Sequence, residues 1–128
     1  MKRLLILLAI SVFAITACKK SSVNSVLAGK WELRHQNGGW GYDSTYVAGN
    51  GNIFDFYGNN RFKRYEKGAL AEQGTFHIQK ATKELGSTDV IIFNNDVYGE
   101  PLELSNGILS IGTSAADGII NHYQKIAD

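Results

Sequence analysis

Short hydrophobic stretches alternate with polar ones along most of the chain, from Leu27 to the C-terminus. The hydrophobic stretches are rich in β-branched and aromatic residues, and clusters of Gly, Asn and Asp separate them about every 8–12 residues, which is typical of an all-β sandwich or barrel. After the first 17 residues, no segment carries apolar positions at the helical period. The pattern therefore predicts an all-β domain.

The hydrophobic pattern resolves into eight predicted strands. In the first strand, Trp31, Leu33 and His35 share one face by strict alternation, and the residues between them share the other face. Asn106 and Gly107 lie between two apolar runs and predict a tight hairpin, because both residues tolerate positive φ. The predicted strands are residues 29–36, 51–57, 61–66, 73–79, 90–93, 102–104, 108–111 and 118–126.

Eight short strands joined by tight turns favour an eight-stranded antiparallel up-and-down barrel, because closure removes the exposed edges of a sheet. A two-sheet sandwich is the alternative. The one long connection, residues 36–50, is rich in glycine and contains Trp40, and we interpret it as a mobile flap or loop at one end of the barrel. A barrel of this size is either filled by its own side chains or holds one small ligand.

The first 17 residues have a different pattern. Lys2 and Arg3 precede an apolar run that extends from Leu4 to Ala17, as in a secretory signal. A helix that spans a bilayer needs about 20 apolar residues, so the run is short for the alternative of a membrane-spanning anchor. We expect residues 1–17 to be a helical signal peptide.

The signal ends in Ile15-Thr16-Ala17-Cys18, which resembles the lipobox of bacterial lipoproteins. This resemblance implies that Cys18, the only cysteine, carries acyl chains such as palmitate and becomes the first residue of the mature protein. We expect the lipid to anchor the protein, with residues 18–26 as a tether and residues 27–128 as one domain. Because Lys19 is not the aspartate of an inner-membrane retention signal and no acidic run follows, we expect the periplasmic face of the outer membrane.

Segments of the predicted barrel together resemble the lipocalin-like domains of Bacteroidetes lipoproteins; they are residues 27–33, 54–65, 74–76 and 123–126. The first segment contains Gly29-Lys30-Trp31, a form of the lipocalin Gly-x-Trp motif. The family usually ends in Tyr-x-Arg, whereas this chain has Lys125, which lacks the planar guanidinium. The resemblance implies a lipocalin-like barrel in which Trp31 packs beside the last strand at Lys125.

A small apolar ligand would contact the inward-facing aromatic residues and their neighbours. The candidate ligand-binding residues are Trp31, His35, Trp40, Phe54, Phe56, Phe62, Phe76 and Tyr123. In the alternative, the aromatic residues pack against one another and fill the barrel. The protein would then be a structural or inhibitory accessory that acts through its loops, particularly residues 36–50.

No catalytic or metal-binding constellation is recognisable. The histidines, His35, His77 and His122, do not converge under strict alternation, and none has a second ligand two or four residues away. Ser110 is not part of a Gly-x-Ser-x-Gly motif, and no pair of carboxylates flanks a visible cleft. We therefore predict a non-catalytic protein without a metal or other cofactor.

The charge balance bears on possible partners. The chain has 13 basic and 12 acidic residues, and removal of the signal with its two basic residues leaves 11 basic residues and a formal charge of −1. A near-neutral chain argues against a nucleic-acid partner and against electrostatic attraction to a membrane surface. The expected partners are the membrane, through the N-terminal lipid, and either a small hydrophobic ligand or an envelope protein.

Overall fold

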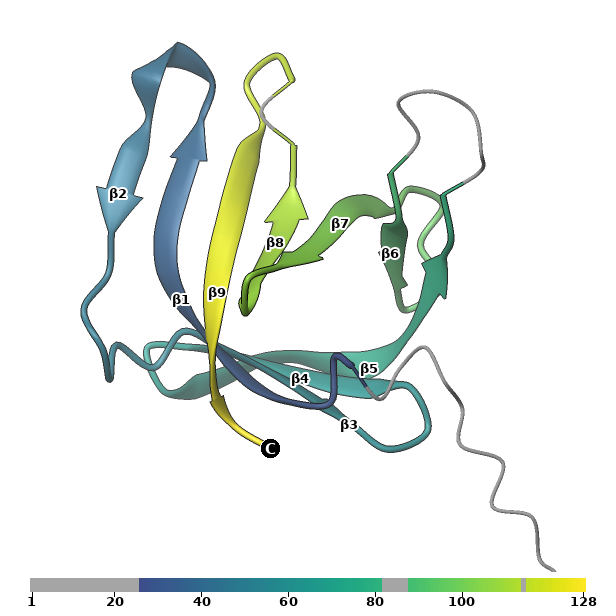
Figure 1. Cartoon of the computed structure of the whole chain (residues 1–128). Coiled ribbons are helices and arrows are strands. Elements are labelled where there is room, and N and C mark those ends of the chain that lie inside the picture. Colours follow the sequence, from purple (N-terminus) through teal and green to yellow (C-terminus); the bar gives the residue numbers. More distant parts are fainter. Residues whose placement is uncertain (1–25, 82–87, 114) are drawn as a thin grey trace, which may run out of the picture.

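The computed structural model describes residues 26–81, 88–113 and 115–128 (Figure 1). These residues form nine β-strands and one short 3-10 turn. The elements are β1 (Gly29–Gly38), η1 (Gly39–Gly41), β2 (Asp43–Thr45), β3 (Ile53–Tyr57), β4 (Arg61–Glu66), β5 (Ala69–Gln79), β6 (Val90–Phe93), β7 (Glu100–Ser105), β8 (Ile108–Gly112) and β9 (Ile119–Ala127). Cys18 and the expected signal peptide lie outside the described residues. No helix among the described residues is long and apolar enough to cross a membrane.

The strands form a closed antiparallel barrel with up-and-down order. Each strand from β3 to β8 pairs with the next, and β9 returns to pair with β1 along most of its length. The first part of β1 pairs with β3, and its last part pairs with β2. Figure 1 shows β1, β9 and β8 side by side, with β3, β4 and β5 running across their lower end. The predicted eight-stranded barrel is confirmed, and β2 is an additional short strand within the 36–50 connection.

The tight turns follow from residues that tolerate positive φ. Asn106 and Gly107 have φ values of 52° and 76° and join β7 to β8, as the hairpin prediction requires. Asn59 and Asn60, with φ values of 61° and 56°, join β3 to β4. Asparagine and glycine enter this region at the lowest cost, so these turns fix the register of both hairpins.

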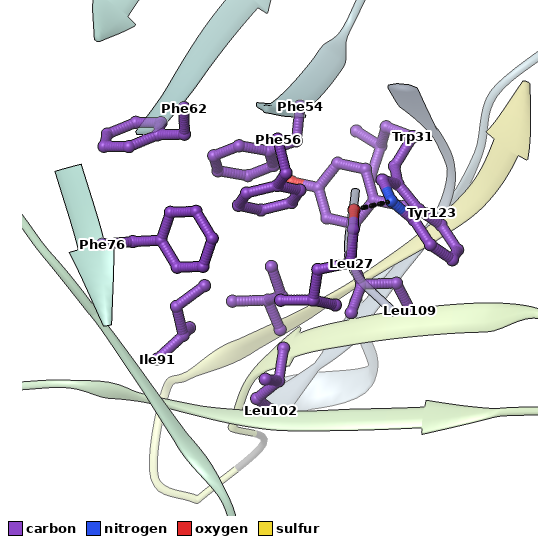
Figure 2. Close-up of a cluster of buried hydrophobic side chains, with 12 residues drawn as sticks. Leu27, Trp31, Phe54, Phe56, Phe62, Phe76, Ile91, Leu102, Leu109 and Tyr123 are labelled. Atoms are coloured by element: carbon purple, nitrogen blue, oxygen red, sulfur yellow. Dashed lines mark hydrogen bonds between the residues drawn. The ribbon is translucent and has the colours of Figure 1, made fainter. Parts of the chain in front are cut away.

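Aromatic and aliphatic side chains together fill one half of the barrel (Figure 2). The rings of Phe56 and Phe76 meet edge to face, with centroids 5.0 Å apart. Trp31 is only 2 % exposed, and its Nε1 donates a hydrogen bond to the Leu27 carbonyl oxygen at 2.8 Å. The ammonium of Lys125 lies 5.9 Å from the centroid of the Trp31 ring. The start of β1 thus packs against the end of β9, as the sequence predicted.

A β-bulge changes which residues of β1 face the interior. Leu33 pairs with Tyr123, but the next pair is His35 with His122, so Arg34 is an extra residue on β1. An extra residue reverses the alternation beyond it. Strict alternation predicted that His35 shares the inward face of Trp31, and this prediction is wrong because of the bulge. His35 lies on the outer surface with its ring stacked on that of His122, the centroids 5.3 Å apart.

The outer face of β1 carries a buried carboxylate. Glu32 is 3 % exposed because the chain that follows β2 folds over it. Its Oε2 accepts a hydrogen bond from the Gly49 amide at 3.1 Å and pairs with Nη2 of Arg34 at 2.9 Å. Its Oε1 accepts a longer bond from the Gly51 amide at 3.4 Å. The carboxylate thus holds this loop against the barrel wall.

Candidate functional site

The half of the barrel beyond the aromatic cluster contains a cavity of about 680 Å³ that opens to solvent. All eight barrel strands contribute to its lining. Leu33 and Gln36 face it from β1, on either side of the bulge. The interior is therefore packed at one end and hollow at the other.

The cavity has an aromatic floor where it meets the packed half. The rings of Phe54 and Phe93 stack with centroids 5.5 Å apart, and the ring of Tyr123 meets that of Phe54 edge-on at 5.4 Å. Leu33 and Ile111 complete the apolar part of the lining. Figure 2 shows Tyr123 beside Phe54 within this cluster. The floor can accept the apolar body of a ligand.

Charged side chains from β4 and β5 form one wall of the cavity. Arg64 lies between two carboxylates, with its Nη1 2.5 Å from Oε1 of Glu66 and its Nε 3.2 Å from Oε2 of Glu72. The amide of Asn94 donates to the other oxygen of Glu72 at 3.2 Å. The guanidinium charge is thus already balanced within the protein.

Glu100, at the start of β7, lines the same cavity and is exposed, and its side chain forms no hydrogen bond or ion pair with another described residue. Loss of solvent around its carboxyl group raises the pKa of Glu100. The charge of Arg64 opposes this shift, and that of Glu72 adds to it. Glu100 is therefore a carboxylate in the cavity without a cationic partner of its own.

Tyr123 presents a second unpartnered polar group. The residue is 8 % exposed and lines the cavity, and its hydroxyl forms no hydrogen bond with a described residue. Burial is the main cause that raises the pKa of Tyr123, and the nearby negative charge of Glu100 adds to it. The phenol stays neutral at physiological pH and can donate or accept a hydrogen bond.

A network of amides and hydroxyls lies opposite the charged wall. The Tyr46 hydroxyl donates to Oε1 of Gln36 at 2.5 Å, and Nε2 of Gln36 donates to Oδ1 of Asn121 at 2.6 Å. These bonds tie the chain after β2 to β1 and β9. They hold the polar wall in place before any ligand binds.

The predicted ligand-binding residues occupy three different environments. Phe54 and Tyr123 line the cavity. Phe56, Phe62, Phe76 and Trp31 are buried in the packed half and do not line the cavity.

The other two candidates lie on the surface. His35 is on the outer face of the barrel, and Trp40 is 94 % exposed in η1. Trp40 adds a contact between loops, because its indole N–H donates to the carboxylate of Asp117 in the chain between β8 and β9.

The charged residues of the cavity were not predicted as site residues. The alternation of inward and outward positions along each strand would nevertheless have placed Arg64 and Glu72 on the inward face. Arg64 lies two residues after the inward-facing Phe62, and Glu72 lies four residues before the inward-facing Phe76. The strand register also pairs Arg64 with Glu72. Charged residues on a strand are usually solvated, so the pattern alone did not separate these from surface residues.

A polar network on the outer face joins β8, β9 and β1. His122 Nδ1 is 2.8 Å from Ser110 Oγ, and its Nε2 is 2.8 Å from Asn37 Oδ1. His35 Nε2 lies 2.7 Å from Asp43 Oδ1 on β2. The described residues contain no group of three or more side chains suited to hold a metal ion. The network braces neighbouring strands and lies apart from the cavity.

Comparisons with protein-family models, curated proteins and solved structures found no match to this chain.

Proposed function

We propose that this protein is a non-catalytic binding protein whose barrel holds one small amphipathic ligand. The observation that carries the proposal is the cavity of about 680 Å³. Small-molecule sites usually measure about 300–1,000 Å³ and combine an apolar surface with a few placed polar groups. The cavity has the usual size but is more polar, because half of its sixteen lining residues are charged or carry amides. A ligand with both an apolar and a polar part would use the floor and the wall, whereas a purely apolar ligand would leave the wall unused. The alternative of a completely filled barrel matches only the packed half.

The proposal includes attachment to a membrane. The lipobox-like sequence and the resemblance to lipocalin-like lipoproteins support an acyl anchor on Cys18, close to the barrel that starts at Gly29. The lipid would hold the barrel at the periplasmic face of the outer membrane. The cavity would then sample molecules of the envelope.

Metabolic labelling with a fatty-acid probe tests the anchor. The wild-type protein should incorporate the label and sediment with membranes, because the lipid is attached to the Cys18 sulfur. Cys18→Ser should abolish the label and leave any exported protein soluble. Absence of label from the wild-type protein would refute the anchor and leave the cavity proposal unaffected.

Calorimetric titration with three compounds tests the cavity. Phenylbutylamine, phenylbutanol and phenylbutyrate share an apolar body that fits the floor and differ only in the head group. At least one should bind, and Ile111→Trp should weaken its binding by about tenfold or more, because the indole would occupy space along the cavity wall.

The matched control is Ile108→Trp on the same strand. Ile108 is 38 % exposed and does not line the cavity, so the variant should bind like the wild type. Thermal melting of both variants checks that the fold is intact. If none of the three compounds binds, or if both variants weaken binding equally, the cavity is not the binding site.

A further inference from the structure

The groups in the cavity that lack partners indicate what kind of ligand would complete it; this step rests on the proposed function. Arg64 is paired with two carboxylates, so it offers little to an incoming anion. Glu100 and the Tyr123 hydroxyl have no partner among the described residues. The polar groups that the cavity leaves for a ligand are therefore an exposed carboxylate, that of Glu100, and a buried phenol, that of Tyr123.

The net charge of the residues that line the cavity also favours a cationic ligand. The charged residues that line the cavity are Arg64, Glu66, Lys67, Glu72 and Glu100, and Tyr46, Tyr65 and Tyr123 are the other titratable residues of the lining. Three acidic residues face two basic ones; Glu66, Lys67 and Glu100 are exposed, and Arg64 and Glu72 are half-buried. An incoming cation would balance the excess negative charge, whereas an incoming anion would increase it.

The aromatic floor suits a cation as well as an apolar group. Ring faces attract ammonium groups within about 6 Å, most strongly where water is excluded. Phe54 is stacked on Phe56 and on Phe93, so Phe93 and Tyr123 are the rings of the floor that can meet such a group. A neutral head group would gain less from this contact, and the negative ring face would repel an anionic one.

We infer that the cavity selects amphipathic amines: an apolar body rests on Phe54 and Phe93, and a protonated amine donates hydrogen bonds to the Glu100 carboxylate and the Tyr123 hydroxyl. Charge-assisted hydrogen bonds of this kind are about twice as strong as neutral ones. They would satisfy both unpartnered groups at once. A carboxylate ligand would have to displace Glu66 or Glu72 from Arg64, or bind the other basic residue of the lining, Lys67, in the exposed turn between β4 and β5.

The same three phenylbutyl compounds test the head-group preference. Phenylbutylamine should bind about tenfold or more tightly than phenylbutyrate, since about 1.4 kcal/mol corresponds to a factor of ten. Glu100→Gln should remove most of this preference while leaving phenylbutanol binding within about twofold. Tyr123→Phe should weaken the amine more than the alcohol. The matched control is Glu103→Gln, because Glu103 is exposed on the same strand, as Glu100 is, but does not line the cavity, and this variant should have no effect.

The affinity should also depend on pH in one direction. Because the pKa of Glu100 is raised in the empty cavity, the carboxylate becomes protonated at a higher pH than an ordinary glutamate. Amine binding should weaken as the pH falls through this range, and phenylbutanol binding should not.

The outcomes separate the two claims. If no compound binds, the proposed function fails. If phenylbutanol or phenylbutyrate binds as tightly as the amine, and Glu100→Gln changes nothing, the cavity binds ligands but the selectivity for amines is refuted.

Discussion

Replacing Trp31 with alanine is expected to lower the free energy of unfolding by about 3–5 kcal/mol. The side chain is 2 % exposed, and the Leu27 carbonyl would lose its indole donor at 2.8 Å. Lys125 would lose the ring on which its ammonium rests. Domains of this size are stable by only about 5–15 kcal/mol, so a drop in melting temperature of roughly 12 °C or more should accompany the change.

Trp40→Ala is the matched control for Trp31→Ala. Trp40 is 94 % exposed, and the hydrogen bond from its indole N–H to Asp117 joins two surface loops. Exposed substitutions usually change stability by less than about 0.5 kcal/mol, so the melting temperature should barely move. Equal thermal shifts for the two variants would contradict the placement of one tryptophan in the core and the other in a surface turn.

Replacing Glu32 with alanine is expected to cost about 2–3 kcal/mol, a value at the lower end for a broken buried ion pair. The substitution removes the acceptor for the Gly49 and Gly51 amides and leaves the charge of Arg34 without its partner. The side chain of Arg34 is 24 % exposed, so water recovers part of the loss. Chemical denaturation measures the effect.

Glu103→Ala provides the comparison for the Glu32 variant. Glu103 is an exposed carboxylate on β7, and its removal should change the free energy of unfolding by less than about 0.5 kcal/mol. A Glu32→Ala variant as stable as Glu103→Ala would mean that the loop does not depend on the buried carboxylate.

Much of the barrel could be predicted because local chemistry specifies it. The ranges of β4 and β6 match their predictions, and asparagine or glycine forms the predicted turns. The start of β5 was missed because Ala69, Leu70 and Ala71 carry no β-branched or aromatic signal. Pairing with β4 makes that segment a strand. Likewise, β2 is formed by pairing with the end of β1 inside a glycine-rich connection.

The candidate site was harder to predict because it depends on contacts between distant segments. The bulge at Arg34 turns His35 outward and Gln36 inward, and no feature of the local sequence marks it. Glu32 was expected on the outer face, and it is buried there only because the chain after β2 returns over it. Alternation placed Phe54 and Tyr123 correctly inside, but could not show that the barrel is hollow beside them.

The central claim is that a ligand binds inside the hollow half of the barrel, and a backbone amide NMR titration with phenylbutylamine tests it most directly. The predicted result is that the largest changes fall on Phe54, Glu100, Tyr123 and their neighbours in the cavity lining, with little change at Trp40. Changes confined to Trp40 and the rest of residues 36–50, with none in the cavity lining, would contradict the claim by placing the binding site on the outer loops.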